Sequence, residues 1–299
     1  MKFLAIFLLS AAFLRGADPP RVEWDKARSW AYQITGYPED KLAGLAATKA
    51  DIVVIDLARD GGDRYFTKEE ISALRATGKH VLAYFEIGAI EEFRPEWKSV
   101  PADLKAGRVE GWPDEQYVKY WDPRWWPVVR ARLDRALDAG FDGAYLDMLT
   151  TYQEIPGSGL GDEERARRMV DLIIRLSKHA KARQAGFRIV PQNAPELATW
   201  SHWEPAPNRP YLDAIDGLGL ESVFFIAHDK PARADWCTEN RRDAVSIRKE
   251  GKIVLGVDYV KKPGNAAESR RLQRALGFIP LATTVELDHP GHVEGAGEK

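Results

Sequence analysis

The 299-residue sequence contains a single cysteine, Cys237. One cysteine excludes an internal disulfide and any zinc site built from cysteines, so the hydrophobic core has to supply the stability. The six histidines form no His-x-His pair on a predicted strand and no His-Glu-x-x-His motif, so the usual metal-ligand spacings are also missing. We therefore expect neither a metal ion nor a cofactor.

No hydrophobic run reaches the roughly 20 residues that a membrane-spanning helix needs. Met1 and Lys2, the apolar run that begins at Phe3, and small residues up to Ala17 are typical of a cleavable signal peptide. We predict a signal peptide over residues 1–17, a single catalytic domain over residues 18–299, and a secreted or periplasmic location. We expect the mature protein to be a monomer without a membrane anchor.

Neither sign of charge dominates, since 43 Lys and Arg residues face 45 Asp and Glu residues, for a net charge of −2. Loss of Lys2 and Arg15 with the signal peptide removes two cations and gives a net charge of about −4. Because nucleic acid binding needs a basic surface, we expect no nucleic acid partner.

Apolar runs recur directly after glycines that are placed to end helices. A glycine just past a helix adopts the left-handed conformation at little cost, and a continuous apolar run is typical of a buried parallel strand. Five runs follow Gly78, Gly140, Gly186, Gly251 and Gly277 in this way. With three further runs, the predicted strands are residues 31–34, 52–57, 80–86, 141–147, 187–193, 217–223, 252–258 and 278–284.

Helix signals lie between these runs. Thr67 and Glu70 have the spacing of a capping box. Further helix starts are predicted at Asp122–Pro123, at about Asp162 and at Asn265. Eight strands alternating with helices predict an α/β fold, a single (β/α)8 TIM barrel, with an open doubly wound sheet as the alternative.

Polar residues end nearly every predicted strand. In a barrel of this class the carboxyl ends of the strands carry the active site, and a charged side chain there costs desolvation unless it is paired or faces a wet cleft. Glycosidic bond hydrolysis needs one carboxylic acid and one carboxylate. The strand-end candidates are Gln33, Asp56, Glu86, Asp147, Gln192, Asn193, Glu221, Asp258, Glu286 and Asp288.

Aromatic residues add a second signal, because apolar sugar faces stack on indole and phenol rings. The insertion over residues 89–121 holds three tryptophans, including Trp121, and Tyr84 and Tyr259 lie on predicted strands. Any one tryptophan fits a packing role at least as well. Asp56 and Asp258 equally fit buried partners of Arg or Lys that orient loops.

Six segments together resemble the endo-α-1,4-polygalactosaminidase family of glycoside hydrolases. The most specific is Gly-Phe-Asp-Gly-Ala-Tyr-Leu-Asp at residues 140–147, and the resemblance covers most of the chain after the signal peptide. The third strand departs from the family pattern, because Glu86 replaces a serine and Ala89 replaces a glutamate. The other segments are residues 30–33, 51–56, 81–88, 191–193 and 220–222.

The resemblance implies hydrolysis of an α-1,4-linked galactosamine-containing polysaccharide, with Asp147 and Glu221 as the catalytic pair. We take Asp147 as the nucleophile or base and Glu221 as the acid. The predicted substrate-binding residues are Asp56, Tyr84, Glu86, Gln192, Asn193, Asp258, Tyr259 and Trp121.

Two other functions stay open on the sequence. One is a carbohydrate-binding barrel that has lost catalysis, which the altered third strand allows. The other is a Mg²⁺-dependent lyase or phosphodiesterase, since hard cations prefer carboxylate oxygens.

Overall fold

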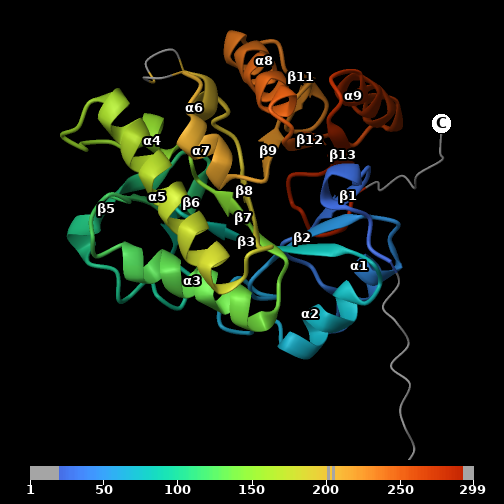
Figure 1. Cartoon of the computed structure of the whole chain (residues 1–299), viewed down its shortest axis with the longest axis horizontal. Helices are drawn as coiled ribbons and strands as arrows, with labels where there is room; N and C mark the ends of the chain where they lie inside the picture. Colours follow the sequence, from blue (N-terminus) through green and yellow to red (C-terminus); the bar gives the residue numbers. More distant parts are fainter. Residues whose placement is uncertain (1–19, 201–202, 204–205, 292–299) are drawn as a thin grey trace, which may run out of the picture.

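The computed structural model describes residues 20–200, 203 and 206–291 (Figure 1). The predicted signal peptide lies outside the described residues. Within the part of the chain that the structure describes, no helix combines the length and the apolar character needed to cross a membrane.

Eight parallel strands, one for each predicted run, form the centre of the molecule. They form two sheets, in the orders β1-β2-β3-β7-β8 and β9-β12-β13. A single β-bridge between Gln192 and Gly219 joins the two sheets. β13 contacts β1, and Ile34 N donates to Leu287 O (2.9 Å) nearby, but no ladder joins these two strands in the described ranges. The strands are β1 Trp30–Tyr32, β2 Ile52–Asp56, β3 His80–Glu86, β7 Gly143–Asp147, β8 Arg188–Pro191, β9 Gly217–Glu221, β12 Ile253–Tyr259 and β13 Ile279–Thr283.

Helices follow the strands along the chain and lie outside them (Figure 1). This alternation is the (β/α)8 class predicted from the sequence. The helices are α1 Ala43–Ala47, α2 Lys68–Arg75, α3 Trp126–Ala139, α4 Thr151–Glu154, α5 Asp162–Arg183, α6 Glu196–Thr199, α7 Arg209–Ala214, α8 Asp235–Lys249 and α9 Pro263–Ala275. A short hairpin, β10 Phe225–Ile226 and β11 Lys230–Pro231, follows β9.

The insertion after β3 contains a small antiparallel sheet in the order β4-β6-β5. These three strands are not predicted from the sequence, because residues 89–121 are rich in turn-forming residues. β4 is Ala89–Glu91, β5 is Lys105–Val109 and β6 is Trp112–Val118.

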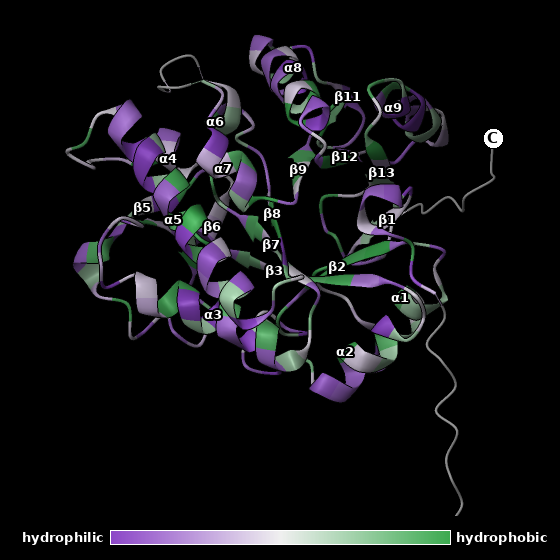
Figure 2. Cartoon of the chain, in the orientation of Figure 1, coloured by the Kyte–Doolittle hydropathy of each residue, from purple (hydrophilic) through white to green (hydrophobic). Residues whose placement is uncertain are grey.

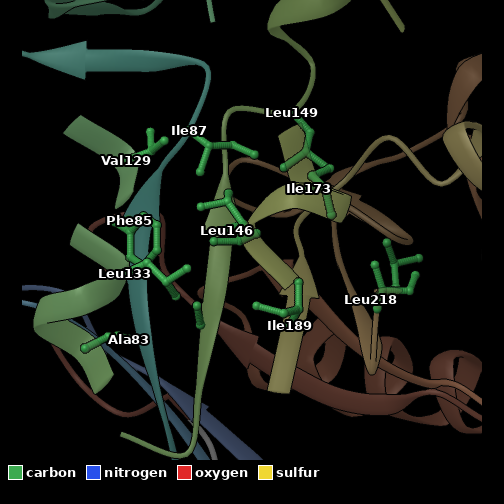
Figure 3. Close-up of a cluster of buried hydrophobic side chains, with 14 of the residues drawn as sticks. Ala83, Phe85, Ile87, Val129, Leu133, Leu146, Leu149, Ile173, Ile189 and Leu218 are labelled. Atoms are coloured by element: carbon green, nitrogen blue, oxygen red, sulfur yellow. The ribbon is translucent and has the colours of Figure 1, made fainter. Parts of the chain in front are cut away.

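The pleat divides the side chains of each strand between two cores, because successive residues point to opposite faces. On the outer face, Phe85 of β3 points toward Val129 and Leu133 of α3 (Figure 3). Figure 2 shows the helices as alternating hydrophobic and hydrophilic bands around the more hydrophobic strands. The inner face holds a second core, which includes Trp30, Tyr32, Val54, Leu82, Tyr84, Tyr145, Val190, Val257 and Tyr259.

The helix signals are confirmed in part. The capping box at Thr67 is present, α5 begins at Asp162, and Gly140 is left-handed with φ of 83°. Two predicted starts are wrong. α3 begins at Trp126, because Pro127 fills the early helical position while the Asp122 carboxylate accepts a hydrogen bond from Arg124 N in the preceding turn.

The start predicted at Asn265 is also wrong. α9 begins at Pro263, with Lys262 as its N-cap residue, since proline suits the first turn of a helix. Asn265 Nδ2 instead donates to Asp229 Oδ1 (2.9 Å) in the preceding loop. Gly186 does not adopt the left-handed conformation predicted for it, and Gln184 in extended geometry ends α5.

We expect Thr67→Ala to lower the free energy of unfolding by about 1 kcal/mol, because Glu70 N loses its side-chain acceptor. Chemical denaturation measures this loss. Thr67→Ser is the matched control, since it keeps the accepting hydroxyl and should unfold close to the wild type. Equal loss in both variants would contradict a capping role.

Candidate active site

Two carboxylates, Asp147 and Glu221, end strands that flank β8. Asp147 is two residues after Tyr145, and Glu221 is two residues after Gly219, so both acids point to the inner face of the barrel. A Cβ at Gly219 would lie 2.0 Å from the Tyr145 hydroxyl oxygen, so the Tyr145 side chain reaches from β7 past β8 to β9 on the inner face. The pleat therefore brings the two acids to one end of the barrel.

Each acid is held by a tyrosine hydroxyl and an N–H group. Tyr84 donates its hydroxyl hydrogen to Asp147 Oδ2 (2.7 Å), and Met148 N donates to Oδ1 (2.6 Å). These contacts hold both oxygens of the Asp147 carboxylate. Since donors stabilise the charged form, they favour an ionised Asp147.

Glu221 is held in the same manner. Asn193 Nδ2 donates to Glu221 Oε2 (2.8 Å), and the Tyr259 hydroxyl donates to Oε1. Asn193 Oδ1 also accepts from Glu221 N (3.0 Å), which fixes the orientation of the amide. Asn193, two residues past the end of β8, therefore orients an acid of the neighbouring strand.

Burial raises the pKa of Asp147 to about 7, and the nearby charge of Glu221 raises it as well, against the lowering effect of the Tyr84 and Met148 hydrogen bonds. Two carboxyls that share a site cannot both ionise freely. The pair therefore keeps a proton up to near-neutral pH, which is the state that acid–base catalysis needs.

The backbone after these strands is strained. Met148 (φ 62°) and Ser222 (φ 53°) directly follow strand ends, Asn193 (φ 65°) lies two residues past one, and all three occupy the left-handed region. Non-glycine residues rarely do so, and such positions cluster at functional sites. Gly88 accommodates the first turn, because a Cβ there would lie 2.1 Å from Met148 O.

Beneath the pair lie two tyrosines that the sequence reading did not select. Tyr32 and Tyr145 are fully buried with ring centroids 5.4 Å apart, and Tyr32 donates its hydroxyl hydrogen to Gln192 Oε1 (3.2 Å). The Tyr145 hydroxyl has no hydrogen-bond partner within the described ranges. The signal available in the sequence was the spacing of two residues between Tyr145 and Asp147, which puts both side chains on one face of the strand.

An open pocket of about 1070 Å³ extends from Glu221 and Asn193. Its walls come from α4, α6 and α8, which run from the left to the top centre of Figure 1. Five of the described lining residues are acidic and one, Arg242, is basic. The acids are Glu154, Glu196, Glu221, Glu239 and Asp243, and two tryptophans, Trp200 and Trp236, also line the pocket.

Two predicted substrate-binding residues, Asp56 and Glu86, lie in a buried ion cluster instead of this pocket. Arg94 bonds both oxygens of Asp56 (3.0 and 2.9 Å) and Glu86 Oε1 (2.6 Å), and Arg132 bonds Glu86 Oε2 (2.9 Å). Burial alone would raise the pKa of Glu86, but Arg94 and Arg132 lower it to about 2. Glu86 is therefore ionised, whereas burial raises the pKa of Asp56 against the lowering effect of Arg94, and arginines bond both oxygens of each acid.

Asp258 also points away from the pocket, because it follows the inward-facing Val257 by one residue. Its carboxylate accepts from Phe224 N (2.8 Å) and Phe225 N (2.9 Å), and from Ser269 Oγ (2.7 Å) and Gln273 Nε2 (3.0 Å) of α9. With four donors, Asp258 holds the loop after β9 against α9.

The remaining predicted substrate-binding residues fall into two groups, those that contact the acid pair and those that do not. Tyr84, Asn193 and Tyr259 contact the acid pair, as described above. Gln192 is buried within the barrel, and Trp121 packs edge-on against Tyr120 (5.0 Å between ring centroids). Among the described residues, no group of three or more His, Cys, Asp or Glu side chains is arranged to hold a metal ion.

An inward-facing acid pair at the carboxyl end of a parallel barrel is the arrangement that (β/α)8 glycoside hydrolases use. The sequence profile of glycoside-hydrolase family GH114 matches residues 13–297, and the chain belongs to this family. The resemblance noted from the sequence is thus confirmed, and the protein is a glycoside hydrolase.

Individual relatives and solved structures are similar to most of the chain. An uncharacterized protein of Deinococcus radiodurans is 31% identical over 267 residues, which are 87% of this chain and 81% of that protein. The crystal structure of Aspergillus fumigatus Ega3 in complex with galactosamine has a TM-score of 0.69 at 17% identity, covering 94% of this chain and all of that one. The glycoside hydrolase domain of PelA from Pseudomonas aeruginosa has a TM-score of 0.70 at 19% identity, covering 90% and 100%. At these identities the structural likeness establishes the fold.

We expect Asp147→Asn to change stability in a pH-dependent way. Because the pKa of Asp147 rises from 3.8 to about 7 on folding, its contribution to stability is fully present below about pH 4 and is lost as the pH rises through about 7. An asparagine does not ionise. The melting temperature of the variant relative to the wild type should therefore be higher at about pH 8 than at about pH 5.

Glu221→Gln serves as a companion variant, since it removes the neighbouring charge that raises the pKa of Asp147. Its stability relative to the wild type should change with pH in the same direction. Melting temperature differences that do not vary with pH in either variant would contradict the electrostatic coupling.

Proposed function

We propose that this glycoside hydrolase is an exported, endo-acting enzyme that cleaves α-1,4-linked galactosamine-containing polysaccharide. Asp147 acts as the nucleophile or base, and Glu221 acts as the acid. The observation that carries the proposal is the inward-facing pair itself, with each acid held by a tyrosine hydroxyl and an N–H group.

The geometry supports this division of roles. Glu221 lines the open pocket, which gives it access to the glycosidic oxygen of a chain lying there, whereas Asp147 lies at the adjacent strand end with both oxygens held. The one proton that the coupled pair retains has to reside on Glu221 when the bond breaks, and Glu221 then gives it to the leaving oxygen. Asp147 attacks the anomeric carbon or removes a proton from the attacking water. Its negative charge stabilises the positive charge that develops on the sugar ring.

The pocket lining supports a cationic sugar polymer. Five acids against one arginine give the described lining an excess of negative charge, which attracts the protonated amino groups of deacetylated galactosamine. The galactosamine bound to the structurally similar Aspergillus fumigatus Ega3 points to the same class of substrate.

Export is part of the proposal and is supported by the charged start, apolar run and small residues over residues 1–17. Determining the N-terminal residue of protein recovered from the medium or periplasm tests it.

The activity is tested by release of reducing ends from partially deacetylated α-1,4-polygalactosamine. We expect release by the wild type and a loss of at least about 10³-fold in Asp147→Asn and in Glu221→Gln, since each removes a reacting group. Asp171→Asn, on the exposed face of α5, is the matched control and should retain activity.

The same assay separates the alternatives. Binding of the polymer without release by any variant would favour the carbohydrate-binding barrel. Release that a chelator abolishes would favour the Mg²⁺-dependent enzyme.

The two roles are distinguished by chemical rescue with azide. If Asp147 is a nucleophile, azide should restore turnover to Asp147→Ala and give a glycosyl azide of inverted anomeric configuration, because azide attacks the face that the carboxylate vacates. Rescue of Glu221→Ala with that product, and of Asp147→Ala with the retained product, would reverse the assignment. Nuclear magnetic resonance of the products decides between them.

A further inference from the structure

One wall of the pocket is a face of α8, which we call the α8 face. It consists of Trp236, Glu239, Asn240 and Asp243. These residues are spaced by three, four and seven positions, so they lie on one side of the helix, and all four line the pocket. At 1.5 Å per residue, the face extends about 10 Å from Trp236 to Asp243. That length accommodates more than one sugar ring.

Trp236 is 49% exposed, and of the two most exposed tryptophans, Trp112 and Trp236, it is the one that lines this pocket. Contact of an exposed indole with water is unfavourable, and a partner that covers the ring removes this apolar surface from water. A pyranose ring is a suitable partner for an indole face. Its position at the start of α8, on the rim of a pocket that contains a catalytic acid, gives such a partner access.

Negative charge on this face is poorly compensated. Glu239 is exposed and forms no hydrogen bond or ion pair with the described residues, while Asp243 has a long contact with Arg242 Nε (3.3 Å). Across the pocket, burial raises the pKa of Glu196, and the charges of Asp243 and Glu239 raise it too. Acids from two walls thus repel each other, and a cation placed between them would relieve that repulsion.

We propose that this α8 face is a chain-binding surface for the polymer beyond the cleaved bond. Glu239 and Asp243 pair with the amino groups of successive sugar residues, and Trp236 stacks against one ring. The proposal rests on the function proposed above and deepens it, because it assigns the preference for a deacetylated chain to residues outside the catalytic pair.

Calorimetric binding to the full-length Asp147→Asn protein tests the proposal, with a deacetylated α-1,4-galactosamine hexasaccharide and its fully N-acetylated form as probes. Adding Glu239→Gln and Asp243→Asn should weaken binding of the deacetylated probe by about tenfold and leave the acetylated probe nearly unaffected. High salt should abolish this difference, because it screens exposed ion pairs. Trp236→Ala should weaken binding of both probes.

Asp235→Asn is the matched control, since Asp235 belongs to α8 but does not line the pocket. Glu239→Gln alone is the second variant, because this side chain is exposed and its replacement disturbs no buried contact. If the α8 variants bind both probes as tightly as the parent while the wild type cleaves the polymer, the α8 proposal is overturned and the proposed function stands. If the wild type neither cleaves the polymer nor binds either probe, the proposed function itself is overturned.

Discussion

The alternation of side chains along neighbouring parallel strands decides which residues of this protein can act together. Asp147 and Glu221 meet because each lies an even number of residues from an inward-facing position, whereas Asp258 is one residue out of phase and faces α9. A shift of one residue in the register of β7 or β9 would move an acid from the interior to the helix layer. The tyrosines that hold the acids, the pocket and the chemistry all depend on that phase.

A second constraint comes from the neighbouring acids. Asp56 and Glu86 also point inward, and two more buried carboxylates beside the pair would raise the cost of ionising any of them. Arg94 bonds both acids and Arg132 bonds Glu86, which offsets part of this cost, although the charge of Glu86 still raises the pKa of Asp147. The glutamate at position 86 is therefore accompanied by two arginines.

The eight strands were predictable because their apolar runs are long and are set off by glycines, and the resemblance identified the acid pair. The direction of the side chains, one helix start and the contacts between distant helices could not be predicted from the sequence. Apolar runs without polar alternation do not reveal which residues face inward, so Asp258 was grouped with the site while Tyr145 was not. The helix start at Asp122 was misplaced because a local turn competes for the same carboxylate. The acids of the α8 face lie across the pocket from Glu196 of α6, and no local sequence pattern indicates that the two helices are neighbours.

Arg94 follows β4 of the insertion, yet it bonds the ends of β2 and β3 and also Glu91 of β4. Separation of the insertion from the barrel would therefore leave the buried carboxylate of Asp56 without its arginine and Glu86 with Arg132 alone, which is far costlier than fraying an ordinary surface loop. Hydrogen exchange in β4, β6 and the ends of β2 and β3 should consequently proceed through one cooperative opening. In a chain with one cysteine, this ionic connection takes the place of a covalent cross-link and makes the rim of the barrel a single unfolding unit.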